Sequence, residues 1–213
     1  MNPGDCVVDA GANIGYVTLL LSRWVGEAGC VHSFEPVQET FEWLAESVRR
    51  LKLANVNLHN CGLSDSAHSA TMGIPRYVSG GENLYESCIV GEGRGARFAR
   101  TVNVSLNTLD ALLAGSSQRL SFIKIDVEGH ELLAVKGALQ VISRDKPALL
   151  IEVTGDPDRP DLPAGELFAL LAGLDYSPFV WDCGELRERR SGEQQGDYFF
   201  LQKDSPLIPC IVE

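Results

Sequence analysis

The sequence predicts an α/β protein with a doubly wound, mostly parallel sheet, and three observations support this. Short apolar runs recur along the chain and are typical of strands covered on both faces. Segments with apolar residues at helical spacing separate these runs, as in parallel βαβ units. The composition is globular, with 45% hydrophobic and 22% charged residues among 213. Because crossovers between parallel strands are right-handed, the doubly wound sheet is the leading topology.

The expected strands and helices alternate from the first residues onward. The predicted strands are residues 6–10, 30–34, 56–60, 121–125, 148–153, 177–182 and 197–202. The predicted helices are residues 15–25, 38–53, 131–143 and 164–174. In the second helix, Phe41, Leu44, Ala45 and Val48 follow the i, i+3, i+4, i+7 spacing of one buried face.

Two segments depart from this alternation. Residues 74–100 are rich in glycine and show no period, so we expect an irregular insertion that is either a binding loop or lid, or disordered. Residues 155–163 carry three prolines directly after a strand and predict a loop. The sequence contains no repeat or low-complexity linker, so we expect residues 1–213 to form a single domain.

Charge and cysteine content limit the partners and the compartment. The net charge of −11 argues against nucleic-acid and membrane partners, because an acidic surface repels phosphate backbones and anionic lipids. The apolar runs are all shorter than the roughly 18 residues of a membrane span. The six cysteines include no C-x-x-C pair, and Cys6 and Cys30 sit in apolar runs where we expect buried free thiols. With no signal-peptide pattern at its start, the sequence predicts a reducing, cytoplasmic compartment.

A glycine-rich turn follows the first strand and begins the first helix. It runs from Asp9 to Gly15, with Gly11 and Asn13 between them. Glycine lets the backbone turn tightly and approach a ligand, and unpaired N–H groups at the helix start suit a polar or anionic ligand. In an open α/β sheet, ligands bind at this carboxyl edge of the strands.

Glu35 ends the next strand and indicates a nucleoside ligand. It lies 24 positions after Gly11, close to the roughly 20-residue offset at which an acidic residue binds ribose hydroxyls. Its two oxygens match a vicinal diol, and Pro36 holds it in an extended conformation. The turn lacks the third glycine of a dinucleotide fingerprint, and the Asp9 carboxylate would repel a pyrophosphate but suits a cation. These features favour S-adenosylmethionine, which carries a sulfonium, over NAD or FAD.

A second acidic group follows the fourth predicted strand. Asp126 and Glu128 alternate, so in extended backbone both would project to the same side, and Glu152 ends the next strand at the same edge. Carboxylates brought close together raise at least one pKa, which makes a candidate general base. The structural alternative is helix capping, which contributes less than about 1 kcal/mol. His130 is expected to be an exposed early helix residue, and Lys124 to form a structural ion pair.

The motifs DAGANIG, FEP, KIDVEGHE with a following KGA, and IEV resemble the FkbM family of S-adenosylmethionine-dependent methyltransferases. The resemblance runs from about residue 5 to about residue 202. It implies the class I methyltransferase fold, a Rossmann-like, seven-stranded sheet whose last strand is antiparallel. It also implies an O-methyltransferase that acts on hydroxyls of natural products, sugars or glycolipids.

The resemblance also implies roles for individual residues. The expected cofactor-binding residues are Asp9, Gly11, Asn13, Gly15, Glu35, Asp65 and Asp126. Asp65 would accept a hydrogen bond from the adenine amino group, and Leu63 would pack on the ring. The expected catalytic residues are Asp126, Glu128 and Glu152, with Asp126 or Glu128 as the base.

Several alternatives stay open at this level. The three carboxylates could hold Mg²⁺, whereas the sequence shows no His and Cys ligand set for zinc, and no metal is assigned. An NAD-linked oxidoreductase would need a tight G-x-G-x-x-G and a catalytic Tyr/Lys or His pair, and the sequence shows neither. A non-catalytic binding module would have lost residues such as Glu35 or Asp126. The partner is expected to be a small hydroxylated acceptor, with candidate contacts at Arg76, Tyr77, Tyr85 and Arg97.

Overall fold

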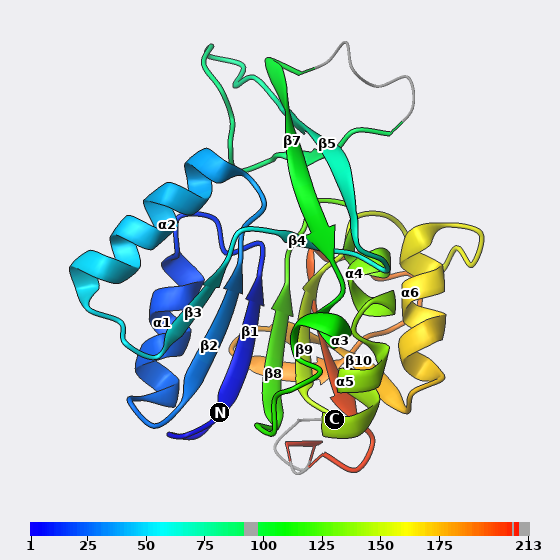
Figure 1. The fold of residues 1–213 in the computed structure, drawn as a ribbon. Helices are drawn as coiled ribbons and strands as arrows, with labels where there is room; N and C mark the ends of the chain where they lie inside the picture. Colours follow the sequence, from blue (N-terminus) through cyan, green and yellow to red (C-terminus); the bar gives the residue numbers. More distant parts are fainter. Residues whose placement is uncertain (92–97, 206, 209–213) are drawn as a thin grey trace.

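A computed structural model describes residues 1–91, 98–205 and 207–208, which form two sheets and the helices around them (Figure 1). The larger sheet contains β1 (Cys6–Ala10), β2 (Cys30–Phe34), β3 (Val56–His59), β8 (Leu120–Ile125), β9 (Ala148–Glu152), β10 (Tyr176–Asp182), β11 (Glu185–Glu188) and β12 (Asp197–Gln202). The smaller sheet contains β4 (Gly62–Leu63), β5 (His68–Ile74), β6 (Cys88–Ile89) and β7 (Arg100–Asn107). The helices are α1 (Tyr16–Val25), α2 (Gln38–Leu51), α3 (Leu109–Leu112), α4 (Glu131–Lys136), α5 (Leu139–Asp145) and α6 (Pro163–Ala172).

The larger sheet has the strand order β11-β10-β12-β9-β8-β1-β2-β3. Strands β3, β2, β1, β8 and β9 pair in parallel, whereas β12 pairs antiparallel with both β9 and β10. This confirms the predicted fold class, with its antiparallel last strand. The sheet has eight strands rather than seven because β11 adds a hairpin at one edge. Cys183 and Gly184 both have positive φ, as a two-residue hairpin turn requires.

Helices cover both faces of the larger sheet. Val7 and Val31 face Leu21 and Val25 of α1 on one side. The alternate residues of β1 and β2 belong to the main core, together with buried residues of α4, α5 and α6 on the other side. The predicted helix at 131–143 is divided into α4 and α5 at Gly137, where a Cβ atom would lie 1.9 Å from the Ser64 carbonyl oxygen. The division therefore comes from a close backbone approach that the helical period does not reveal.

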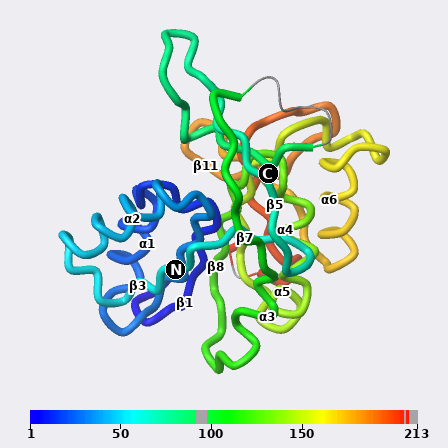
Figure 2. Tube along the Cα trace, turned by 45° about the horizontal axis from the view of Figure 1, so that its top comes forward, coloured from blue at the N-terminus to red at the C-terminus, as the bar shows by residue number. Residues whose placement is uncertain are grey.

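The smaller sheet, called the cap below, stands above the carboxyl ends of the central strands (Figure 1). Figure 2 shows β5 and β7 crossing in front of these strands when the top of the molecule is turned forward. The cap has its own apolar cluster, built around Met72, Val104 and Leu106 with Val37 from the main layer. The part of the 74–100 segment that is described connects β5 to β7 and includes β6. Among the described residues, no helix is long and apolar enough to cross a lipid bilayer.

Cys6 and Cys30 are joined by a disulfide, so the expectation of two free thiols is wrong, although both residues are buried as expected. The parallel register of β1 and β2 sets Cys6 opposite Cys30, with the Cα atoms 4.6 Å apart. This proximity follows from strand pairing, which the cysteine spacing does not show. Cys210 lies outside the described residues.

Candidate active site

The turn between β1 and α1 lies directly against the loop between β8 and α4. Gly11 has a φ of 77°, and a Cβ atom on it would lie 1.8 Å from the carbonyl oxygen of Asp126. The N–H of Asp126 in turn donates to the carbonyl of Ala10, at 3.1 Å. Glycine is needed here because two backbones touch, and this contact sets Asp126 beside the glycine turn.

The N–H groups of this turn are already used within the chain. Those of residues 11–15 donate to acceptors of Phe34, Ala12, Glu35 and Asn13. These five N–H groups are therefore not available to a ligand, whereas the unpaired N–H groups expected at the start of α1, from Tyr16 onward, stay a prediction. A phosphate needs such donors, whereas a cation does not. The turn is accordingly better suited to a positively charged ligand than to a pyrophosphate.

Glu35 is held rigidly at the end of β2. Its side chain is almost completely buried, and its two carboxylate oxygens accept from the N–H groups of Asn13 (3.1 Å) and Val37 (2.9 Å). Burial raises the pKa of Glu35 to about 7, although the two N–H donors oppose this shift. Each carboxylate oxygen can accept a further hydrogen bond. The carboxylate is thus preorganised to accept from two neighbouring hydroxyls.

A cavity of about 490 Å³ lies between the glycine turn, the β8–α4 loop and the cap. Its volume falls within the range of about 300–1,000 Å³ found for small-molecule sites. Four of the expected cofactor-binding residues line it: Gly11, Asn13, Glu35 and Asp126. Glu128, Leu63, Lys124 and His130 also line it.

The other expected cofactor-binding residues lie outside this lining. Asp9 is fully buried beneath the turn, where it accepts from the Thr18 hydroxyl (2.6 Å), and burial raises its pKa. Gly15 is the N-cap residue of α1, and a Cβ atom there would lie 2.7 Å from the Leu44 side chain of α2. Asp65 is exposed and accepts from the neighbouring Ser64 and Ser66 hydroxyls. We infer that Asp9 and Gly15 shape the turn from below, without direct contact with a ligand in the cavity.

Three carboxylates and one ammonium group lie together at this edge: Asp126, Glu128 and Lys124 line the cavity, whereas Glu152 lies outside its lining. Single oxygens of Asp126, Glu128 and Glu152 lie within 4.8 Å of one another. The Lys124 ammonium lies 2.9 Å from Asp126 and 3.8 Å from the buried Asp9, which confirms its predicted ion pair. A hydrogen bond to Asp126 raises the pKa of Glu152 to about 7, and burial adds to this shift.

Glu128 reaches the cavity by a route that sequence reasoning did not anticipate. Strand β8 ends at Ile125, and Glu128 has a φ of 51°, so the segment is not extended as assumed. The left-handed conformation is unusual for a residue other than glycine and is found often at functional sites. Burial raises the pKa of Glu128, and the nearby Asp126 raises it further.

Several site residues were missed from the sequence. Asp197 begins β12 opposite Glu152, and burial together with Asp126 raises its pKa. The sequence could have indicated Asp197, because the first residue of a strand that runs antiparallel to its neighbour lies beside the carboxyl end of that neighbour. Glu131 was also missed: its carboxylate accepts from the N–H of Gly129 (2.7 Å) and braces the β8–α4 loop. His130, expected to be exposed, is half-buried and contacts the Ser64 hydroxyl.

The cap supplies an apolar wall opposite the carboxylates. Its lining side chains are Met72, Leu84, Tyr85, Ile89 and Leu106. Of the four candidate acceptor contacts, Tyr85 lines the cavity, Arg76 and Tyr77 do not, and Arg97 lies outside the described residues. The sequence did not reveal this wall because its residues come together only when the strands of the cap pair with one another.

Comparisons with known proteins point to one family. The model of the family described as Methyltransferase FkbM domain matches residues 9–178. Methyltransferase sdnD of Sordaria araneosa is 30% identical over 154 residues, covering 62% of this chain and 59% of the relative. Methyltransferase 1 of Beauveria bassiana is 25% identical over 143 residues, covering 62% and 57%. The chain therefore spans less than two thirds of each relative's own length.

Solved structures share the fold at low sequence identity. A methyltransferase FkbM from Methylobacillus flagellatus superposes with a TM-score of 0.58 at 20% identity, over 92% of this chain and 43% of that one. The fibrillarin of Aeropyrum pernix, solved with S-adenosyl-L-methionine bound, has a TM-score of 0.54 at 12% identity, over 93% and 66%. The methyl donor of the matched family is S-adenosylmethionine, the cofactor expected from the sequence. The match over most of the chain shows that this protein belongs to the FkbM methyltransferase family.

Proposed function

We propose that this chain transfers a methyl group from S-adenosylmethionine to a hydroxyl oxygen of a small acceptor. One observation carries the proposal: Glu35, Asp126 and Glu128 line the same cavity. The expected ribose-binding residue, Glu35, and the two candidate bases, Asp126 and Glu128, therefore face the same cavity. When bound, the donor supplies an electrophilic methyl group on a sulfonium.

The residues present fit this donor. The Glu35 carboxylate can accept from the ribose diol with the lone pairs that Asn13 and Val37 leave free. The turn from Gly11 to Gly15 has no spare N–H groups of its own for a phosphate. The carboxylate wall attracts the sulfonium and ammonium groups. These features favour a cationic nucleoside and disfavour a dinucleotide.

Asp126 or Glu128 can remove the acceptor proton, and Glu152 assists Asp126 from outside the cavity. A hydroxyl must be held about 3 Å from the methyl carbon and in line with the leaving sulfur, and a neutral alcohol is a poor nucleophile unless it loses its proton. Asp126 lines the cavity and hydrogen-bonds to Glu152, whose pKa is raised to about 7. This pair can take the proton at Asp126 and share it with Glu152. Lys124 orients Asp126 through their 2.9 Å contact.

The two walls of the cavity also restrict the acceptor. One wall is apolar and comes from the cap, whereas the other carries carboxylates. Tyr16 and Tyr85 line the cavity and are largely exposed, so they can pack against a ring or an alkyl body. We therefore expect a neutral hydroxylated molecule with an apolar part, rather than a phosphorylated one. A cytoplasmic location, expected from the sequence, belongs to this proposal.

Two measurements test the function. Calorimetric titration should show binding of S-adenosylmethionine and none of NADH, which would separate a methyltransferase from an oxidoreductase. A screen with tritiated donor over hydroxylated acceptors should then show label transfer to a neutral, partly apolar acceptor. Binding without transfer to any acceptor would support the non-catalytic module, and failure to bind the donor at millimolar concentration would refute the proposal.

Variants identify the base within the active enzyme. Asp126→Asn and Glu128→Gln remove one candidate each, and the matched control is Glu42→Gln on the exposed side of α2. We expect turnover to fall by about 100-fold or more for the base, which is the usual contribution of general base catalysis, and to be unchanged in the control. Turnover within a few-fold of wild type in both variants would show that neither carboxylate is the base.

A further inference from the structure

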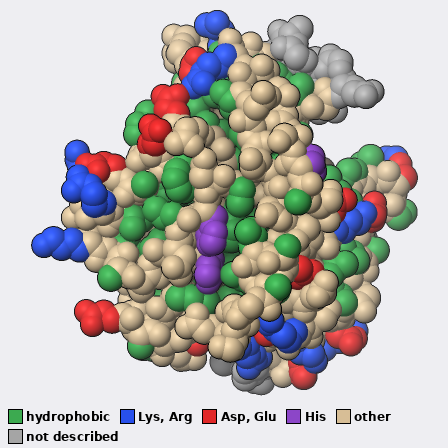
Figure 3. Space-filling model, viewed as in Figure 1, with side chains coloured by type: hydrophobic (Ala, Val, Ile, Leu, Met, Phe, Trp, Pro, Cys, Tyr) green, Lys and Arg blue, Asp and Glu red, His purple; other side chains and the backbone are tan. Residues whose placement is uncertain are grey.

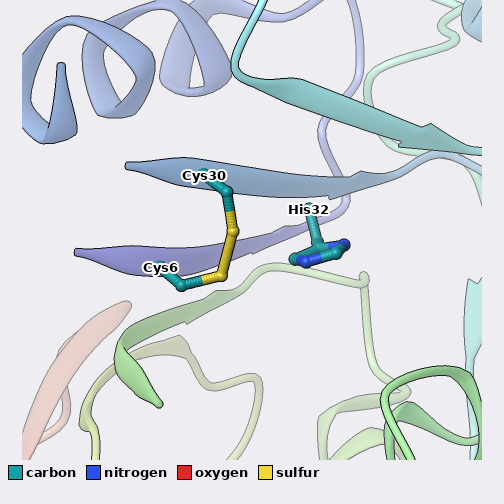
Figure 4. Close-up of side chains that lie close together, drawn as sticks. All are labelled: Cys6, Cys30 and His32. Atoms are coloured by element: carbon teal, nitrogen blue, oxygen red, sulfur yellow. A yellow bond between two sulfur atoms is a disulfide. The ribbon is translucent and has the colours of Figure 1, made fainter. Parts of the chain in front are cut away.

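A second group of reactive side chains lies at the far end of β1 and β2 from the cavity. Cys6 and Cys30 are the first residues of these strands, whereas Gly11 and Glu35 follow their last residues. His32 lies two positions after Cys30, so its side chain projects from the same face of the strand. Figure 4 shows the imidazole of His32 beside the sulfur atoms, on the same side of both strands. The two Sγ atoms and one imidazole nitrogen lie within 4.8 Å of one another.

The imidazole of His32 is oriented by a neighbour. Its Nδ1 lies 3.1 Å from Nε2 of His59 on β3, and the His59 ring stacks on Phe34 with ring centroids 4.4 Å apart. This contact leaves Nε2 of His32 for another bond. In protein metal sites, a histidine ligand almost always engages its second nitrogen in a hydrogen bond, usually to a carboxylate, a backbone carbonyl or water, which fixes the ring. Here the partner is the imidazole of His59. His32 and His59 thus have the arrangement of a ligand and its supporting group.

We propose that the reduced chain binds one Zn²⁺ ion through the thiolates of Cys6 and Cys30 and the imidazole of His32. Thiolate sulfur and imidazole nitrogen are the preferred zinc ligands. With Zn–S bonds of about 2.3 Å, two tetrahedral thiolates lie about 3.8 Å apart, a separation that side chains on directly opposed residues can reach. The fourth position is left for water or for the Gln118 side chain, whose oxygen lies 3.4 Å from Cys30 Sγ.

The disulfide and the zinc complex are alternative states of the same two cysteines. A dithiol reductant supplies two electrons and two protons, which break the S–S bond and give two thiols, while the reductant becomes a disulfide. Zinc binding then displaces the two thiol protons and forms two S–Zn bonds. Glutathione and thioredoxin keep thiols reduced in the cytosol, so the zinc-binding state belongs to a reducing compartment.

The ion can reach the site from solvent. Cys6 and Cys30 are buried, but His32 and His59 are only half-buried, so part of each imidazole reaches solvent. Histidine side chains are among those visible on the face of the molecule drawn in Figure 3. Since the strands carry the cavity residues at their other ends, this ion would not touch methyl donor or acceptor. Its role is to join β1 to β2, in place of the disulfide.

The sequence hides this site because its ligands are distributed over two strands. Zinc motifs are usually recognised by pairs of ligands a few residues apart on one segment. Here Cys6 lies 24 residues before Cys30, and only the parallel register makes them neighbours.

Metal titration of the reduced protein tests the proposal. The full chain is reduced, freed of reductant without oxygen, and titrated with Zn²⁺ against a chromophoric chelator, with Co²⁺ as a spectroscopic probe for thiolate bonds. We expect one Zn²⁺ per reduced chain, a thiolate-to-cobalt absorption band, and no tight binding to the oxidised chain. Melting of the reduced chain should shift to higher temperature with Zn²⁺, because a ligand that binds only the folded state stabilises it.

Variants make the result specific. Cys30→Ser and His32→Gln should each weaken zinc binding by more than about tenfold. Cys183→Ser, which alters an exposed thiol elsewhere, should not change it. His32→Gln keeps both cysteines and alters a half-buried position, so it tests the site even if Cys30→Ser fails to fold. The proposal is refuted if the reduced wild type binds no Zn²⁺, if the disulfide resists reduction in the folded protein, or if His32→Gln binds as tightly as wild type. None of these readouts depends on methyl transfer.

Discussion

Replacing Gly11 by alanine tests the contact on which the site depends. The added Cβ atom would lie 1.8 Å from the Asp126 carbonyl oxygen, whereas ordinary contact begins near 3.4 Å, so the two backbones must separate by about 1.6 Å. An alanine in the left-handed conformation costs about 1–2 kcal/mol, and overpacking a rigid contact costs about 1–3 kcal/mol. Loss of the bond from the Asp126 N–H to Ala10 adds about 0.5–1.5 kcal/mol. We therefore expect Gly11→Ala to destabilise the fold by about 3–6 kcal/mol.

A matched control separates the clash from the backbone conformation. Gly192 has a φ of 86°, and a Cβ atom added there would meet nothing within 4 Å, so Gly192→Ala carries the conformational cost alone. At about 2–4 °C per kcal/mol for a chain of this size, Gly11→Ala should lower the melting temperature by at least about 6 °C and Gly192→Ala by about 2–8 °C.

The assay is thermal or urea unfolding, followed by calorimetric titration with S-adenosylmethionine. Because the separation displaces Asp126 and the turn together, Gly11→Ala should also lose donor affinity, whereas Gly192→Ala should keep it. Equal destabilisation of the two variants, with donor affinity retained in both, would refute the argument that backbone contact holds the site together.

Four further predictions concern charged groups. Glu35→Gln should weaken donor binding by about 10–100-fold in calorimetry at pH 8, because charge-assisted hydrogen bonds to the ribose become neutral ones and one backbone N–H loses its acceptor. Burial raises the pKa of Glu35 to about 7, so its ionisation opposes folding by about 3 kcal/mol. The free energy of unfolding of wild type, relative to that of Glu35→Gln, should therefore fall between pH 5 and pH 8 in urea unfolding. A difference between the two that does not change with pH would contradict this. Turnover should rise with pH through about 7, because Glu152 shares a proton with Asp126. In Glu152→Gln, the rising limb of the pH–rate profile should move to lower pH. A limb that stays at the same pH would exclude the shared proton. Lys124→Met should destabilise the protein by about 3–5 kcal/mol in urea unfolding, since it leaves the buried Asp9 without its counter-charge, and a loss below about 1 kcal/mol would argue against this ion pair.

Patterns of neighbouring residues were sufficient to predict features that depend on neighbouring residues, such as the boundaries of buried strands. The strands at 6–10, 30–34 and 197–202 begin and end as predicted, because an apolar run bounded by polar or glycine residues is recognisable within a few positions. The order of strands and helices then restricts the topology, and the carboxyl edge collects the residues that follow each parallel strand. Glu35 and Asp126 line the cavity for this reason.

Contacts between distant segments decided the rest. The cap was missed because β5 and β7 pair with each other above the sheet, and their partly exposed residues lack the apolar runs of buried strands. Asp197 joins the carboxylates only because β12 runs antiparallel. The extended backbone assumed for Glu128 was wrong because the β8–α4 loop turns sharply after Ile125.

The sequence alone determined the fold class, the family and the sheet edge that bears the carboxylates, because periodicity and short motifs are properties of neighbouring residues. Tertiary structure decided which of those residues face the cavity. It buried Asp9 beneath the turn, consumed the N–H groups of residues 11–15 and brought Cys6 against Cys30. Such features depend on strand register and on the approach of backbones far apart in the chain, which no local pattern encodes.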